Sequence, residues 1–421
     1  MVVAVADTAW LQLQQLCDRH GVEATSLGTF TGDGILHVRY GSTTVLHLDT
    51  HFLHDGRPQR DMNAVLPSPR RDHADPPPCA DVAATLLALL GHPNIASKEA
   101  VIRRYDHEIL GSTVVRPLIG PNRDGHADGV VIADPADTHG MAVGIGVNPW
   151  FGELDPYRMA HAVVDEAIRN VVAVGADPDK VALLDNFSWG DPRRPSTLGE
   201  LVEAVRGCCE ASVAHHAPFV SGKDSLNNEY LGADGARHSV PPTLVITAIA
   251  HVPDANAVVT PDLKHAGNRV VQVGATRCEF GGSHFAKVHD TAGLAPVPGY
   301  DPSASARYRR LHRALRSGRV VACHDLSEGG LAVALAEMAV AGRLGLSIDT
   351  LPGPDPVSAL FSESSSRFVC EVAPSDVAWL EELLGEPVTI LGTVTDTPTL
   401  TLPGATAIAL DALVMAFGAQ S

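Results

Sequence analysis

The sequence predicts an α/β protein of the α+β type, built from two successive α/β domains behind a short N-terminal αβ fragment. Two stretches support this prediction, because strand-like apolar runs alternate with helical periodicity from residue 109 to 251 and again from residue 269 onward. The step Thr260-Pro261 separates the two stretches and marks a domain junction. We therefore expect domains at 101–258 and 259–421.

The first hundred residues differ from the rest of the chain. Residues 1–50 show four strand-like runs (VVAV, ATSLGTF, ILHVRY and TTVLHL) and a helix from Thr8 to His20, a set too small to cover its own apolar face. Residues 51–80 are polar and proline-rich, and a helix follows from Asp81, a suitable N-cap, to Leu90. We expect the αβ fragment to lean on other structure, and residues 51–100 to form a linker and a helix.

Composition excludes several classes of partner. The chain has 421 residues, of which 45% are hydrophobic, and a formal net charge of −18. A protein this acidic repels nucleic acid and anionic membranes, so we expect neither as a partner. The seven cysteines form no CxxC pair, which supports neither a disulfide framework nor a zinc site. There is no signal sequence and no apolar run of about 18 residues, so we expect a cytoplasmic protein.

One long helix carries two oxygen donors at helical spacing. The stretch from Tyr157 to Gly175 contains no proline and no internal glycine, and its apolar residues recur at i, i+3 and i+4. Glu166 and Asn170 are four residues apart, so their side-chain oxygens lie one turn apart on one face and can share a hard cation. The alternative is an exposed glutamate and an asparagine that weakens the helix.

Two aspartates at strand ends are further candidates for this cation. Asp128 stands in HADGVVI beside Gly129, where an ordinary turn aspartate is the alternative. Asp325 ends the strand RVVACHD, and the turn that follows contains Gly329 and Gly330 before a helix. Such a turn offers backbone N–H groups and a positive helix end to an anion, while Asp325 could hold the anion's cation. An ordinary capped helix is equally compatible with the pattern.

Three other motifs are candidate phosphate contacts. Two are short polar segments after strands. The first follows the strand start FV but lacks the spacing of a P-loop, and the second has the form of either an anion cradle or a plain loop. Arg367 precedes a buried strand, as either a phosphate contact or a structural ion pair. No catalytic residue is assigned. The two segments are Lys223, Asp224 and Ser225, and Gly281, Gly282 and Ser283.

In their order along the chain, these motifs resemble the C-terminal half of phosphoribosylformylglycinamidine synthase. This purine-pathway ligase belongs to a superfamily with aminoimidazole ribonucleotide synthetase and selenophosphate synthetase. The resemblance covers almost the whole chain, and it implies a two-domain nucleotide-binding unit in which Mg²⁺ links carboxylates to ATP or ADP. The matching segments include GVEATSLGTF, HPNIASKEAVIRRYDHEIL, HADGVV, LDPYRMAHAVVDEAIRNVVAVGADP, SGKDSLNNEY, FGGSHF, HDLSEGGLAVALAEMA and FSESSSRFV.

Carried over residue by residue, the resemblance implies metal ligands at Asp128, Glu166, Asn170 and Asp325, and a phosphate contact at Lys223. The reaction it implies is ATP-dependent amidation. The formyl amide oxygen of the substrate is phosphorylated, and ammonia from a glutaminase partner displaces phosphate to give the amidine. Catalysis of this kind depends on positioning and charge neutralisation rather than on a covalent nucleophile.

The chain also departs from the family pattern. The family's N-terminal half carries a Thr-His-Asn-His-Pro motif that does not occur here, the first residues match the tail of a preceding domain, and no glutaminase Cys-His-Glu segment follows. We therefore expect a split ligase, in which this chain works with a separate N-terminal synthase subunit and a glutaminase subunit. The alternatives are a homodimeric ATP-dependent relative in nucleoside secondary metabolism, and a non-catalytic scaffold stabilised by bound nucleotide.

Overall fold

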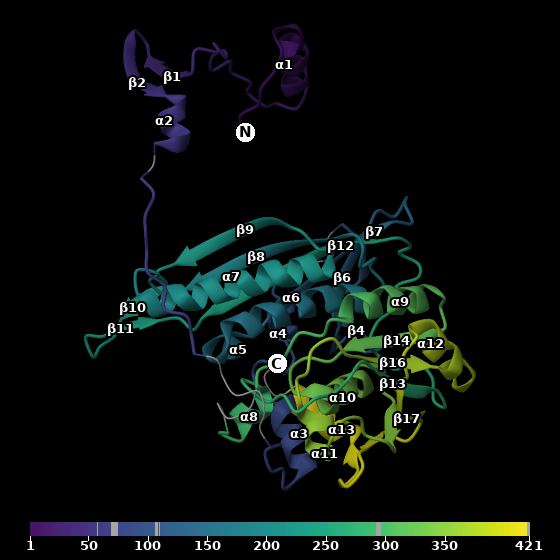
Figure 1. Ribbon diagram of the computed structural model, residues 1–421. Coiled ribbons are helices and arrows are strands. Elements are labelled where there is room, and N and C mark those ends of the chain that lie inside the picture. The colour runs from purple at the N-terminus through teal and green to yellow at the C-terminus, as the bar shows by residue number, and fades with distance from the viewer. Residues whose placement is uncertain (57, 69–74, 106–107, 109, 292–295, 419–421) are drawn as a thin grey trace. The chain divides into compact units, whose positions relative to one another are not determined.

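The structure of the protein is a computed structural model that describes residues 1–56, 58–68, 75–105, 108, 110–291 and 296–418. The chain divides into two compact units, Met1–Met62 and Asn63–Ser421, which are described separately (Figure 1). Among the described residues, no helix combines the length and the apolar character needed to cross a membrane.

The first unit contains one hairpin and two helices, and none of its described residues is buried. Its elements are a 3-10 turn (Asp7–Ala9), α1 (Trp10–Arg19), β1 (Ile35–Tyr40), β2 (Thr43–Asp49) and α2 (Thr50–Asp55). The helix predicted at 8–20 is confirmed as α1, and the antiparallel hairpin confirms the strands ILHVRY and TTVLHL. The strands predicted at residues 2–5 and 24–30 are wrong. A strand needs a neighbour for its N–H and C=O groups, and among the described residues neither segment pairs with the β1–β2 hairpin.

The second unit contains two large sheets, the first of which has six strands. These are β3 (Thr113–Val115), β6 (Val130–Ala133), β7 (Gly140–Val147), β8 (Val181–Trp189), β9 (Phe219–Leu226) and β12 (Thr243–Val252). They lie in the order β3-β6-β7-β12-β8-β9, antiparallel except for the pair β8 and β9. Two small hairpins accompany them, namely β4 (Leu118–Ile119) with β5 (Gly125–His126), and β10 (Glu229–Leu231) with β11 (Arg237–Ser239).

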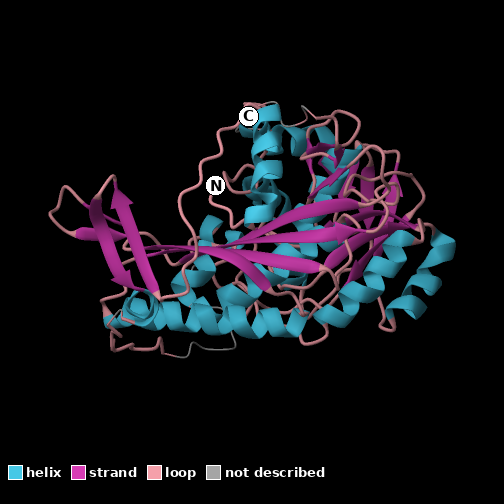
Figure 2. Ribbon diagram, turned by 90° about the horizontal axis from the view of Figure 1, so that it is seen from above, coloured by secondary structure: helices cyan, strands magenta, loops and turns pink. Residues whose placement is uncertain are grey.

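Long helices cover one face of this sheet, as Figures 1 and 2 show. They are α6 (Pro156–Ala173) and α7 (Pro195–His215), preceded by the short α5 (Pro149–Leu154). Glycine at the sheet surface lets α6 approach closely, because a Cβ atom on Gly146 of β7 would lie 2.0 Å from the Val163 carbonyl oxygen. The long helix predicted from the periodicity is therefore confirmed, and its packing fixes the candidate ligands that it carries.

The opposite face of the six-stranded sheet carries exposed apolar side chains. Alternate residues of β7 point away from α6, and among them Met141 and Ile145 are 43% and 50% exposed. Ile132, which pairs with Met141 from β6, is also exposed, as is Val114 of β3. A solvated sheet face normally carries polar side chains. This apolar surface is therefore a candidate contact for another chain.

The second sheet has seven strands. They are β13 (Arg269–Val273), β14 (Val320–Asp325), β15 (Gly345–Ile348), β16 (Phe368–Val372), β17 (Thr389–Thr395), β18 (Thr399–Thr401) and β19 (Ile408–Ala409). Their order is β14-β16-β13-β17-β15-β18-β19, antiparallel except for β15 and β18. The remaining helices are α3 (Val82–Leu90), α4 (Glu99–Ile102), α8 (His284–Val288), α9 (Ala304–Arg316), α10 (Gly330–Gly342), α11 (Pro356–Phe361), α12 (Val377–Leu384, after the 3-10 turn Pro374–Asp376) and α13 (Leu410–Phe417).

The two sheets pack against each other through α6 and α10. α6 contacts β14 and α9, so one apolar core continues from the first sheet into the second. α10 is alanine-rich and buried, and it contacts β5 as well as α3 and α13. The helix predicted at 81–90 is confirmed as α3, and it packs into the second core. The polar wall between these layers is where the candidate site lies.

Candidate functional site

A polar cavity of about 210 Å³ lies where α6, the end of β14 and the start of α10 meet. Acidic, amide and basic side chains make up most of its wall, and both sheet layers contribute them. All four residues that the sequence singled out as cation ligands line this one cavity. The polar lining residues are Asn94, Lys98, His126, Asp128, Glu166, Asn170, His324, Asp325, Ser327, Glu328 and Glu337.

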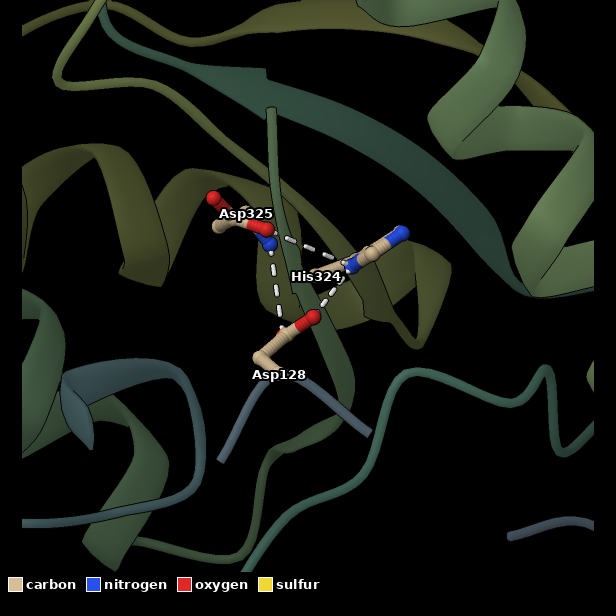
Figure 3. A group of neighbouring side chains, drawn as sticks. All are labelled: Asp128, His324 and Asp325. Atoms are coloured by element: carbon tan, nitrogen blue, oxygen red, sulfur yellow. Dashed lines mark hydrogen bonds and ion pairs between the residues drawn. The ribbon is translucent and has the colours of Figure 1, made fainter. Parts of the chain in front are cut away.

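Asp128, His324 and Asp325 form the tightest group in this wall (Figure 3). One ligand atom from each residue lies within 4.8 Å of the others. His324 Nδ1 lies 2.6 Å from Asp128 Oδ1, and its Nε2 lies 3.1 Å from Glu337 Oε2, so carboxylates hold the ring from both sides. The Asp325 backbone N–H also donates to Asp128 Oδ2 at 3.4 Å. The sequence interpretation did not include His324 or Glu337.

Two glycines allow the chain to turn directly from β14 into α10 and so place Asp325 at the cavity. Gly329 and Gly330 have φ angles of 75° and 70°, a region that favours glycine. A Cβ atom on Gly330 would lie 2.5 Å from the Ser362 carbonyl oxygen. Their N–H groups already donate to Glu363 Oε1 and to the Ser327 carbonyl. The geometry therefore explains these glycines by chain packing, and their role as phosphate contacts stays a prediction.

Glu166 and Asn170 reach the cavity from one face of α6, as their spacing predicts. Glu166 Oε2 accepts a hydrogen bond from the Val147 N–H at 3.0 Å, and Asn170 Nδ2 donates to the Ile145 carbonyl at 2.8 Å. Asn170 Oδ1 is buried and has no hydrogen-bond partner among the described residues. An oxygen left without a donor costs free energy, and a cation would satisfy it.

Burial and mutual repulsion perturb the carboxylates of the cavity. Burial is the largest cause that raises the pKa of Asp128 to about 6, against the lowering effect of His324. Burial and the neighbouring Glu328 raise the pKa of Glu166 well above its ordinary value. Burial likewise raises the pKa of Glu328 to about 7. Such crowding favours the neutral carboxyl forms unless a cation offsets the charge.

The donor set fits a hard divalent cation. Carboxylate and amide oxygens are the ligands that Mg²⁺ and Ca²⁺ take in proteins. Asp128 and Asp325 belong to the tight group, whereas Glu166 and Asn170 line the same cavity outside it. The unpartnered Asn170 oxygen and the raised carboxyl pKa values agree with this chemistry.

The other candidate residues lie away from the cavity. Ser283 is fully buried and caps α8, its Oγ accepting from the Ala286 N–H at 3.1 Å, and the Gly281 N–H donates to the Pro296 carbonyl. Neither residue, nor Gly282 between them, lines the cavity. This segment therefore has a visible structural role, and its contact with a phosphate stays a prediction.

Lys223, Asp224 and Ser225 lie in β9, the edge strand of the six-stranded sheet, rather than at the cavity. The Lys223 ammonium donates to the Ser225 hydroxyl. In register, Lys223 pairs with Asn186 of β8, and most of β9 is exposed. A phosphate bound by these residues would occupy a second surface, distinct from the cavity.

Arg367 has a structural role, but not the ion pair that the sequence offered as one alternative. The side chain is fully buried and donates to the Ser364 and Ser362 carbonyls at 2.7 Å and to Thr276 Oγ1 at 2.9 Å. All of these partners are uncharged protein groups, and Arg367 does not line the cavity. It therefore holds the segment before β16 in place rather than reaching a phosphate.

Lys98 and Glu328 are cavity residues that the sequence interpretation missed. Lys98 is the only lysine or arginine in the described wall of the cavity, and burial lowers its pKa. Its backbone N–H donates to His126 Nε2 at 3.0 Å, so a contact far along the chain positions it. Glu328 lies three residues after Asp325 in the turn HDLSEGG. A second carboxylate in that turn is the sequence feature that could have indicated it as a cavity residue.

The fold and the cavity together define a two-domain α/β protein with an acidic cavity between its layers, lined by oxygen donors of the kind that hard cations take. Two family models match most of this unit, the N-terminal domain of AIR synthase related protein at residues 125–252 and its C-terminal domain at residues 265–404. The chain belongs to the AIR synthase related protein family. The resemblance expected from its motifs is thereby confirmed.

Curated relatives carry the name phosphoribosylformylglycinamidine synthase subunit PurL. The Deinococcus radiodurans protein is 36% identical over 364 residues, which cover 83% of this chain and 46% of that protein. The Chelativorans protein is 34% identical over 370 residues, covering 86% and 47%. The Brucella ovis protein is 32% identical over 394 residues, covering 91% and 50%. The chain thus spans about half the length of the curated relatives that it matches.

Solved structures share the fold. Thermotoga maritima PurL complexed with FGAR aligns with a TM-score of 0.62 at 20% identity, over 80% of this chain and 54% of that one. The same protein complexed with ADP aligns with a TM-score of 0.59 at 18% identity, over 79% and 51%. These likenesses establish the architecture of the two sheet layers.

Proposed function

We propose that this chain is the nucleotide-binding C-terminal half or subunit of a phosphoribosylformylglycinamidine synthase-type ligase. In this proposal it is a cytoplasmic enzyme that supports ATP-dependent amidation of a formyl amide in purine biosynthesis. The observation that carries the proposal is the convergence of Asp128, Glu166, Asn170 and Asp325 on one cavity. The PurL name of relatives at up to 36% identity supports the reaction class. PurL structures complexed with ATP and with ADP support the ligand class.

In the proposal, these four residues would hold Mg²⁺, which when bound would supply positive charge against the phosphates of ATP or ADP. The protein's own groups then position the nucleotide. Lys98 would pair with a phosphate oxygen, because it is the one lysine or arginine in the described wall of the cavity. The glycine turn at the start of α10 supplies a close approach of backbone to ligand, since Gly330 lines the cavity.

We also propose that the chain works with a partner. Met141, Ile145 and Ile132 expose an apolar strip on one face of the six-stranded sheet. Lys223 and Ser225 share that face at the edge strand, since they pair with outward positions of β8. A separate synthase subunit that covers this face would bring the Lys223 segment into an interface, and a glutaminase subunit would supply ammonia. A second copy of the chain could cover the same face, as in the homodimeric alternative.

Titration calorimetry of the full chain with ADP tests nucleotide binding directly. We expect binding that requires Mg²⁺ and that Asp325→Asn weakens at least tenfold, as expected for a lost charged ligand. Glu371→Gln is a matched control, because Glu371 is a fully buried carboxylate that accepts hydrogen bonds from the Lys264 and His265 N–H groups, away from the cavity. Equal ADP binding by wild type and Asp325→Asn would refute the site.

Turnover assays separate the partner hypotheses. The chain with ATP, ammonia and the formyl amide substrate is expected to form amidine only after the synthase subunit is added. Amidine formation by the chain alone would refute the split-ligase part of the proposal, and a dimeric mass in sedimentation would then favour the homodimer. Nucleotide that stays bound through purification without exchange, in a chain that turns over no ATP, would favour the scaffold.

A further inference from the structure

Arg169 joins the two groups of candidate ligands. It stands on α6 between Glu166 and Asn170 in sequence, and it is 3% exposed. Its Nε donates to Asp325 Oδ2 at 3.1 Å, and its Nη2 donates to Ser327 Oγ at 2.8 Å and faces the Leu326 carbonyl at 3.4 Å. One guanidinium therefore holds three consecutive residues at the end of β14.

Other buried groups hold this guanidinium on the side away from Asp325. Arg169 Nη1 donates to Asp165, one helical turn earlier. Asp165 in turn accepts from the Tyr308 hydroxyl of α9, and from the N–H and hydroxyl of Ser366 at 3.0 and 2.8 Å. Arg169, Asp165, Tyr308 and Ser366 are each more than nine-tenths buried. The orientation of Arg169 is therefore determined by packing rather than by solvent.

We propose that Arg169 is a positioning residue that sets the affinity of the cavity for divalent cations by fixing Asp325 against the face of α6 that carries Glu166 and Asn170. This inference rests on the cation site of the proposed function. Arg169 does not line the cavity and touches neither the cation nor the nucleotide. It acts through Asp325, whose Oδ2 it occupies while Asp325 stays within the tight group with Asp128 and His324 (Figure 3).

A positioning role and a purely electrostatic role of Arg169 predict opposite changes in cation affinity when Arg169 is replaced. A positive charge beside a cation site lowers cation affinity by Coulomb repulsion, so its loss alone would strengthen binding. The loss of its hydrogen bonds would instead let Asp325 and Ser327 move and would weaken binding. Arg169→Lys keeps the charge but lacks the planar fork that reaches several acceptors at once, so it isolates the positional effect.

The test measures Mn²⁺ binding by the full chain from the electron paramagnetic resonance of free Mn²⁺, together with thermal unfolding. We expect Arg169→Lys to raise the Mn²⁺ dissociation constant about tenfold or more, the range found for groups that hold metal ligands. Asp165→Asn, a milder change that keeps Arg169 but loosens it, is expected to raise the constant by a smaller factor. Arg319→Lys is the control, because the Arg319 guanidinium also donates from Nε, at 2.9 Å, and from Nη2 to one carboxylate, that of Asp376, and does not line the cavity.

The outcomes distinguish this inference from the proposed function. Wild-type binding that weakens in Arg169→Lys and persists in Arg319→Lys supports the inference. Folded Arg169→Lys protein that binds Mn²⁺ within about twofold of wild type overturns it, as does equal weakening in Arg319→Lys. Should Arg169→Lys fail to fold, unchanged binding in folded Asp165→Asn overturns it. A wild-type chain that binds neither Mn²⁺ nor ADP overturns the proposed function itself.

Discussion

Replacing Asn170 by leucine would separate a cation-binding role from a structural one. Asn170 is 8% exposed, its Oδ1 has no hydrogen-bond partner among the described residues, and its Nδ2 donates to the Ile145 carbonyl at 2.8 Å. Removing a buried unpartnered oxygen gains about 1–3 kcal/mol, and leaving the carbonyl without its donor costs a similar amount. We predict that Asn170→Leu changes the free energy of unfolding of the metal-free chain by less than about 1 kcal/mol. It should weaken divalent-cation binding about tenfold, or about 1.4 kcal/mol.

Denaturant unfolding with and without Mn²⁺, together with Mn²⁺ resonance, measures both quantities on the same samples. Gln272→Leu is a matched control, because Gln272 is 1% exposed, its Oε1 also lacks a partner, and its Nε2 donates to the Gly274 carbonyl at 3.0 Å, all away from the cavity. It should leave Mn²⁺ binding unchanged. Loss of more than about 2 kcal/mol of stability with intact Mn²⁺ binding would show that Asn170 has a structural role and would refute the reasoning.

Three further predictions concern protons, phosphate and the partner surface. Burial raises the pKa of Asp128 to about 6 and that of Glu328 to about 7, so protons compete with the cation for these carboxylates. The affinity for Mn²⁺ should therefore rise from pH 5 to pH 8, and an affinity that does not change with pH would contradict this. Lys98→Ala should weaken Mg-ADP binding about fivefold in calorimetry while Mn²⁺ binding without nucleotide does not weaken, and loss of both would assign Lys98 to folding. Met141→Lys, on the exposed sheet face, should leave the unfolding temperature of the isolated chain within about 2 °C but reduce co-elution with a partner subunit.

The candidate ligands could be found from the sequence because each has a local signal. Asp128 stands beside Gly129 before a strand, Asp325 ends a strand before a turn with two glycines, and Glu166 and Asn170 share helical spacing. The same local logic predicted α6 and the alternation of strands and helices in the two sheet regions. No local pattern shows that residues almost two hundred positions apart meet on one cavity, and that step came from the family resemblance.

Residues placed by long-range contacts had no such signal. Lys98 lies between α3 and α4, in a segment without periodicity, and its backbone reaches the cavity through His126. The register puts Lys223 in an exposed edge strand, outside the cavity, and its contact with a phosphate stays a prediction. The strands expected at residues 2–5 and 24–30 had the right composition, but neither segment pairs with the β1–β2 hairpin of its own unit. In each case tertiary pairing, which a local pattern does not encode, decided the outcome.

The location of the cavity between the two sheet layers links cation binding to the stability of the fold. Asp128 and Glu166 come from the first layer and Asp325 from the second, so a shared cation would hold the layers together. Without a cation, the folded-state pKa of Asp128 lies above its ordinary value near 4, so the folded chain binds more protons than the unfolded chain between about pH 4 and pH 6. Stability of the metal-free chain should therefore fall as pH rises through that window. A cation at a hundred times its dissociation constant adds about 2.7 kcal/mol to the free energy of unfolding. At a fixed cation concentration this stabilisation should be largest above pH 7, because protons no longer neutralise the carboxylates there and the cation binds most tightly.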